Sequence, residues 1–165
     1  MLELFSFLES NKQTLVEDLT ERIPDAVPVF LKVPRSELQE SLDQWFDAFG
    51  DYIVTGEPDT LTTVLRYTTK VRAQQSFKLS DLVRAYLLVL PTVRMQLDEA
   101  EEFQDQEDKA EALEKLEDAH ANAVCLFVDI YQEYLINMLN EHRDYLKKTN
   151  QKYGIDMSKF ITFKG

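Results

Sequence analysis

Apolar residues recur at intervals of three and four along most of this chain, the spacing that places side chains on one face of an α-helix. The first such segment runs from residue 2 to residue 22, and the polar pair Ser10–Asn11 leaves open a break or a second start. Pro24, Pro28 and Pro34 follow within eleven positions and exclude a continuous helix there. The apolar residues between these prolines predict a connector that packs against the rest of the protein.

Two further helices are predicted in the middle of the chain. Ser36 precedes glutamate and glutamine near the third helical position, an arrangement typical of a capping box at the start of a helix. Gly56 and a proline two residues later end this helix, because glycine accepts the left-handed cap and proline prevents continuation. Asp59 or Thr60 is expected to cap the next helix, which is interrupted at Ser76.

The remainder of the chain predicts a buried helix and then a long one. Ser80 is the expected N-cap of the buried helix. Residues 82–90 are apolar almost without interruption, which indicates burial on most sides at the centre of the fold, and Pro91 is expected to kink this helix. Residues 108–152 contain neither proline nor glycine, and they form either one very long helix or two helices with a break near residues 117–122.

These segments predict an all-α fold, a bundle of five or six helices with a long C-terminal helix. The length of 165 residues fits one domain, which we place at residues 1–153, and residues 154–165 form a C-terminal tail or the start of a linker. Hydrophobic residues make up 44% of the chain, which suffices for a sizeable core. Four glycines and five prolines are too few for a β-sandwich or β-barrel with a turn every 8–12 residues or so.

The charge of the chain narrows the classes of partner. Thirty acidic and 18 basic residues give a net charge of −12, which argues against binding of nucleic acid or an anionic membrane surface. No run approaches the roughly 18 apolar residues of a membrane span. The acidic N-terminal residues do not fit a signal peptide, so we expect a cytoplasmic protein. Residues 98–118 hold eleven acids and two bases. They are interpreted as a solvated connector; the alternative is a surface that repels like neighbours or docks a basic partner.

Residues with the chemistry to hold a cofactor or metal are sparse. His120 and His142 are the only histidines, and ~33 Å would separate them along one helix, so they cannot share a metal ion. They are weak cofactor-binding candidates only if haem is present, as a proximal ligand. Glu117 and His120 match the Glu-x-x-His pattern of di-iron bundles once, where two copies are required. Cys125 lies among apolar neighbours and is expected to be a buried, inert thiol.

No sequence motif for catalysis is present. The chain has no nucleophile elbow, phosphate-binding loop, dinucleotide fingerprint or zinc-protease motif. The sequence therefore predicts no enzyme, no catalytic residue, no metal site and no cofactor. One helix face is crowded by Trp45, Phe46 and Phe49, and this face is either part of the core or a homodimer seam.

The most distinctive stretch of the sequence is residues 72–86. Its characteristic residues are Arg72, Ala73, Phe77, Leu79, Leu82, Ala85 and Tyr86. The stretch resembles the N-terminal domains of RsbR-type stressosome proteins and related RsbT co-antagonist modules. Ser76 departs from the resemblance, because that family usually has glycine there. If the turn requires a positive φ, serine is strained at this position.

The resemblance implies a globin-like helical sensor domain without haem, dimeric, at the head of a signalling protein whose final helices lead to a C-terminal STAS domain. We therefore expect a non-catalytic stress-response module that senses a signal, forms a homodimer and relays the signal through its last helix to an output domain or partner protein. The alternative is a globin-like protein that binds a small molecule or a haem-type tetrapyrrole. The aromatic residues that would line such a pocket are Trp45, Phe49, Tyr67, Tyr86 and Phe127.

Overall fold

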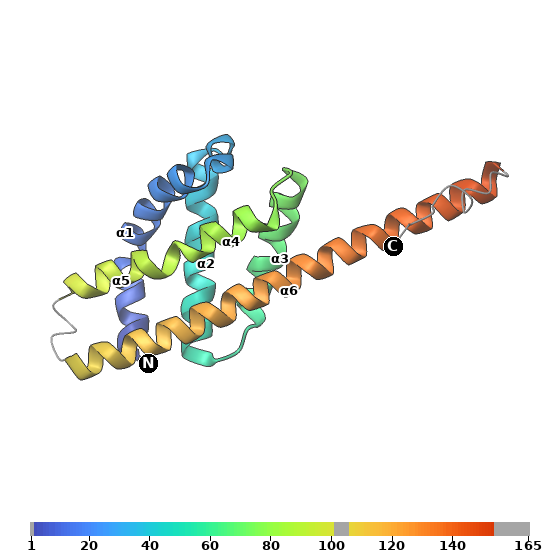
Figure 1. The fold of residues 1–165 in the computed structure, drawn as a ribbon. Helices are drawn as coiled ribbons and strands as arrows, with labels where there is room; N and C mark the ends of the chain where they lie inside the picture. Colours follow the sequence, from blue (N-terminus) through green and yellow to red (C-terminus); the bar gives the residue numbers. More distant parts are fainter. Residues whose placement is uncertain (1, 101–105, 154–165) are drawn as a thin grey trace. The chain divides into compact units, whose positions relative to one another are not determined.

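The computed structural model describes residues 2–100 and 106–153. Within these ranges the chain forms six α-helices and one short 3₁₀-helix, with no strand, which confirms the all-α prediction and the expected number of helices (Figure 1). In chain order the elements are α1 (Leu2–Ala26), η1 (Pro28–Lys32), α2 (Arg35–Thr55), α3 (Asp59–Gln74), α4 (Leu79–Leu87), α5 (Val89–Glu99) and α6 (Gln106–Tyr153).

The chain divides into two compact units with the boundary between Tyr131 and Gln132. In the first unit α1 packs against α2 and α5, and α2 packs against α3. The helix α6 contributes to both units, and it is a single helix, which decides the question of a break near residues 117–122. The predicted tail lies outside the described residues, and the single domain at 1–153 stays a prediction.

Helix α1 continues through both of its predicted interruptions. At the polar pair, the Asn11 side-chain amide donates a hydrogen bond to the Phe7 carbonyl at 2.9 Å, so the break considered there does not occur. Pro24 lies in the last turn of α1, where a missing backbone donor removes little of the helix. The connector prediction is confirmed by Phe30 of η1, which is buried in the core.

The predicted starts of α2, α3 and α4 are wrong by one or two residues. Helix α2 has Pro34 as its N-cap, so Ser36 already lies in the helix and forms no capping box. The N-caps of α3 and α4 are Pro58 and Lys78, so these two helices also begin before the residues expected to cap them. At α4 the backbone N–H of Lys78 donates to the Asp81 carboxylate at 3.2 Å, a bond that replaces the expected Ser80 cap.

The kink expected at Pro91 is instead a break between two helices, about one turn earlier in the chain. Helix α4 ends at Leu87 and α5 begins at Val89. Proline at 91 has no N–H to donate to the carbonyl four residues before it, so the regular helix is interrupted there. The expectation of a helix buried on most sides is wrong in part, because the side chain of Leu87 is exposed.

The core of the first unit decides the role of the crowded aromatic face. Trp45, Phe46 and Phe49 are all buried in the core, and the Trp45 ring stacks on Phe49 with centroids 4.6 Å apart. This face of α2 is therefore core and not a dimer seam. Helix α6 closes the core with residues spaced by three and four, among them Leu116, Ala123 and Phe127.

Ser76 is strained, as anticipated for a turn that requires a left-handed residue. Its φ is 63°, and it ends α3 in a Schellman-type turn in which the Phe77 N–H donates to the Arg72 carbonyl at 3.0 Å. A side chain with a Cβ costs about 1–2 kcal/mol in this conformation, whereas glycine adopts it freely.

Replacing this serine by glycine is expected to stabilise the protein. For Ser76→Gly we expect the free energy of unfolding to rise by about 0.5–1 kcal/mol in urea denaturation, the relief of strain being partly offset by the freer unfolded chain. The matched control Ser10→Gly, inside α1, should lose about 0.5 kcal/mol because glycine is a poor helix former. Equal losses for both variants would show that the turn is not strained.

Candidate functional site

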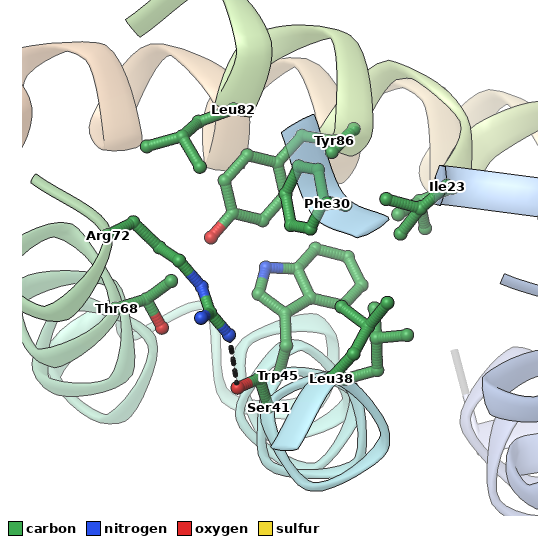
Figure 2. Close-up of a pocket in the computed structure, with 12 residues that line it drawn as sticks. Ile23, Phe30, Leu38, Ser41, Trp45, Thr68, Arg72, Leu82 and Tyr86 are labelled. Atoms are coloured by element: carbon green, nitrogen blue, oxygen red, sulfur yellow. Dashed lines mark hydrogen bonds between the residues drawn. The ribbon is translucent and has the colours of Figure 1, made fainter. Parts of the chain in front are cut away.

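A small cavity lies in the first unit, at the place where α2, α3 and α4 meet (Figure 2). Its volume is about 50 Å³. One water molecule requires about 10–15 Å³, so the cavity has room for about three to five water-sized groups. The residues that line it are Ile23, Phe30, Leu38, Ser41, Leu42, Trp45, Thr68, Arg72, Leu82, Ala85, Tyr86 and Val89.

Helical periodicity explains why these residues share one cavity. Leu38, Leu42 and Trp45 are three or four positions apart and lie on one face of α2. Thr68 and Arg72 are four positions apart on α3. Three faces with this spacing, the third from α4, converge on the same space, so local sequence patterns build each wall of the cavity.

Arg72 is the charged residue of the cavity wall, and its side chain is only 3% exposed. The guanidinium forms an ion pair with Glu37 at 2.6 Å and donates a hydrogen bond to Gln75 Oε1 at 2.8 Å. It also donates to Ser41 Oγ at 3.3 Å, the bond drawn in Figure 2. A buried charge needs such partners, because it has lost its hydration. The ion pair therefore connects α3 to α2, and the Glu37 carboxylate neutralises the positive charge of Arg72.

Trp45 presents an unpaired hydrogen-bond donor. The residue is 3% exposed, and its indole Nε1 has no hydrogen-bond partner among the described residues. Buried polar groups in proteins are almost always hydrogen-bonded. A donor without a partner beside a cavity therefore points to a bound molecule that supplies the acceptor. Figure 2 shows the indole nitrogen on the side that faces the Tyr86 hydroxyl and Arg72.

Tyr86 joins the cavity to α6. Burial raises the pKa of the Tyr86 hydroxyl well above its usual value, against the opposing effect of Arg72, so the hydroxyl stays protonated as a donor. The backbone carbonyl of Tyr86 accepts a hydrogen bond from His120 Nε2 at 2.9 Å, and the Tyr86 ring lies 4.7 Å from that of Phe127. One residue of the cavity wall thus contacts two residues of α6.

A family comparison adds to this geometry. The model of the RsbT co-antagonist protein rsbRD N-terminal domain matches residues 13–145. The chain belongs to this family. Comparisons with curated proteins and with solved structures find no match, so the globin-like character of the fold stays a prediction. The match contains all of the 72–86 stretch and confirms its resemblance to RsbR-type N-terminal domains.

The residues of that stretch divide into two groups in this family member. Arg72, Leu82, Ala85 and Tyr86 line the cavity. The others do not: Phe77 packs edge-on against the Phe30 ring at 4.8 Å, Leu79 is half-buried against the core, and Ala73 is half-buried. The stretch therefore supplies one wall of the cavity and the turn that supports it.

The aromatic pocket considered from the sequence is only partly assembled. Trp45 and Tyr86 line the cavity, whereas Phe49 and Phe127 are fully buried in the core and Tyr67 is 64% exposed. Tyr67 lies in a separate, wider groove of about 400 Å³ between α2 and α3. Ser41, Thr68 and Arg72 line both the groove and the cavity.

The sequence did not point to Glu37 and Ser41 as parts of this site. They are four positions apart at the edge of an apolar helix face, where polar residues are common and carry no signal of their own. Their partner Arg72 is 35 positions from Glu37 in the chain, so the pairing depends on how α3 packs against α2.

Neither histidine is placed to hold a haem in the cavity. His120 is buried, burial lowers its pKa, and its Nε2 donates to the Tyr86 carbonyl, while His142 is exposed in the second unit. Neither residue lines the cavity. The volume of the cavity is also far below the roughly 300–1,000 Å³ of ordinary ligand pockets. In the described part of the chain, no group of three histidine, cysteine or acidic residues is placed to hold a metal ion.

Two further sequence-based expectations need correction. Cys125 is exposed and not buried, because the inward positions of α6 on either side of it are Ala123 and Phe127. The acidic segment is not a connector over most of its length, since α6 begins at Gln106. Its described acids are exposed, and the docking of a basic partner there stays a prediction.

No helix of the described residues is long and apolar enough to cross a membrane.

Proposed function

We propose that this domain is a non-catalytic sensory and dimerisation module that passes a signal along α6 to an output domain or partner protein. The observation that carries the proposal is the double role of Tyr86, which lines the cavity and contacts α6 at His120 and Phe127. Membership of a family of RsbT co-antagonist N-terminal domains supports a place in stressosome signalling.

A second contact between the cavity region and α6 supports the relay. The Tyr131 hydroxyl on α6 donates a hydrogen bond to the Phe77 carbonyl at 3.1 Å, and Phe77 packs against Phe30 of the cavity wall. A ligand shifts an equilibrium only through different affinities for two states. Because the cavity wall at Tyr86 and the supporting turn at Phe77 are each hydrogen-bonded to α6, occupancy of the cavity can favour one packing of that helix.

The second unit supports the dimerisation part of the proposal. Its part of α6 exposes large apolar side chains, which in a protein surface commonly mark an interaction site. They recur at intervals of three and four, as in a coiled-coil seam. We define the distal stripe as Leu135, Met138, Leu139, His142, Tyr145 and Leu146.

A charge placed in the distal stripe is expected to weaken self-association. We expect the wild-type chain to be a dimer at micromolar concentration in light scattering, and Leu139→Glu to raise the dimer dissociation constant at least about tenfold. Leu139 is 70% exposed in the single chain, so the change should leave the helical content in circular dichroism unaltered.

The matched control is Asn140→Glu, which adds the same charge one position along, on the far side of the helix from the stripe. It should leave the dimer intact. A monomeric wild-type chain would refute the dimerisation part. A dimer that Leu139→Glu and Asn140→Glu weaken equally would place the seam elsewhere.

A further inference from the structure

We infer that the cavity binds a small, uncharged, mainly apolar molecule with one hydrogen-bond acceptor oxygen, which receives bonds from the Trp45 indole N–H and the Tyr86 hydroxyl. This inference rests on the proposed sensory function, for which it names the chemical class of the signal. The argument starts from the unpaired Trp45 donor, which is buried, lines the cavity and faces the same space as the Tyr86 hydroxyl (Figure 2).

The polar groups around the cavity select for an acceptor. Trp45 can only donate through its indole nitrogen, and Arg72 likewise offers only donors. The protonated Tyr86 hydroxyl adds a third donor. Ser41 and Thr68 are the other polar residues of the wall, and Ser41 already accepts a bond from Arg72. A ligand that supplies an oxygen acceptor satisfies Trp45, which no protein group of the described chain does.

The charge balance favours an uncharged ligand. Glu37 already pairs with Arg72 at 2.6 Å, so the buried guanidinium is neutralised before any ligand enters. A bound carboxylate would leave one buried negative charge without a counter-ion, and such a charge is costly away from water. The oxygen is therefore expected to be that of a carbonyl or a hydroxyl group.

The size and the lining of the cavity limit the rest of the molecule. A volume of about 50 Å³ accommodates three to five water-sized groups or so. Seven of the twelve lining residues are aliphatic or phenylalanine: Ile23, Phe30, Leu38, Leu42, Leu82, Ala85 and Val89. A short ketone or alcohol of about five heavy atoms combines an apolar body with one acceptor.

The experiment uses the only tryptophan of the chain as its reporter. Trp45 gives a single indole N–H signal in ¹H–¹⁵N NMR spectra, so a titration of the full chain reads the proposed contact directly. We expect 2-butanone to shift this signal saturably and sodium butyrate, of similar size but charged at pH 7, to bind at least about tenfold more weakly. Absence of a saturable shift with 2-butanone, or tighter binding of butyrate, overturns the inference.

Two variants test the geometry of the contact. Tyr86→Phe removes the second donor and should weaken binding of 2-butanone about three- to tenfold, the effect of one hydrogen bond. The matched control Tyr67→Phe removes a hydroxyl outside the cavity and should leave the affinity unchanged. Ala85→Leu adds three carbons to the cavity wall and should abolish the shift. Equal affinities for Tyr86→Phe and Tyr67→Phe overturn the assigned contact.

The outcome is separable from that of the proposed function. The NMR titration measures occupancy of the first unit, whereas light scattering of Leu139→Glu measures association through the second. A chain that dimerises but gives no indole shift refutes the ligand alone. A chain that binds 2-butanone as a strict monomer refutes the dimerisation alone.

Discussion

Replacing Phe127 by alanine is expected to lower the free energy of unfolding by about 3–5 kcal/mol, the largest effect of any change considered for this chain. Phe127 is fully buried on α6, with its ring centroid 4.7 Å from that of Tyr86 and 6.1 Å from that of Tyr131. Truncation removes a large apolar side chain from water-free surroundings and leaves a cavity that the neighbouring rings fill only in part.

The measurement is urea denaturation followed by circular dichroism, with Cys125→Ala as the matched control. Cys125 precedes Phe127 by two positions on the same helix but is exposed, so its truncation should change the stability by no more than about 0.5 kcal/mol. If Phe127→Ala cost as little as the control, the first part of α6 would not be packed on the core as described.

Replacing Glu37 by glutamine is expected to cost about 2–3 kcal/mol. The change preserves the shape of the side chain but leaves the Arg72 guanidinium, 3% exposed, without its counter-charge. Breaking a buried ion pair costs about 3–5 kcal/mol in general. We expect a lower cost here because the Glu37 side chain is 37% exposed, so water partly solvates the pair.

The matched control removes the same charge from an exposed ion pair. Glu21 pairs with Arg35 at 3.2 Å, both side chains are more than half exposed, and Glu21→Gln should cost less than about 1 kcal/mol. The double variant Glu37→Gln with Arg72→Met should recover part of the stability lost by Glu37→Gln alone, because it also removes the unpaired charge. Strict additivity of the two single changes in urea denaturation would contradict a coupled pair.

Local features of the fold were predictable because they depend on neighbours along the chain. Gly56 ends α2 in the left-handed conformation, with φ of 73°, as its position before a proline predicts. Ser76 has a positive φ, the case in which the sequence indicated that serine in place of glycine is strained. The starts of helices were less predictable, because several residues at each start are able to cap, and Asp81 rather than Ser80 makes the bond that begins α4.

The exposure of individual residues was harder to predict. A spacing of three and four shows which residues of α6 share a face, but Cys125 is surrounded by apolar neighbours in sequence and still lies on the exposed side. The core role of Trp45 was equally open, since aromatic residues crowd both cores and dimer seams.

The sequence by itself determined that this chain is all-α, that residues 108–152 are helical, and that residues 72–86 resemble its family. These properties follow from periodicity and short motifs, which are read within a few turns of helix. Only the tertiary structure decided that Arg72 pairs with Glu37, that the Trp45 donor lacks a partner, and that one cavity brings them beside Tyr86. The reason is physical: these residues come from three helices, and their contacts exist only once those helices pack against one another.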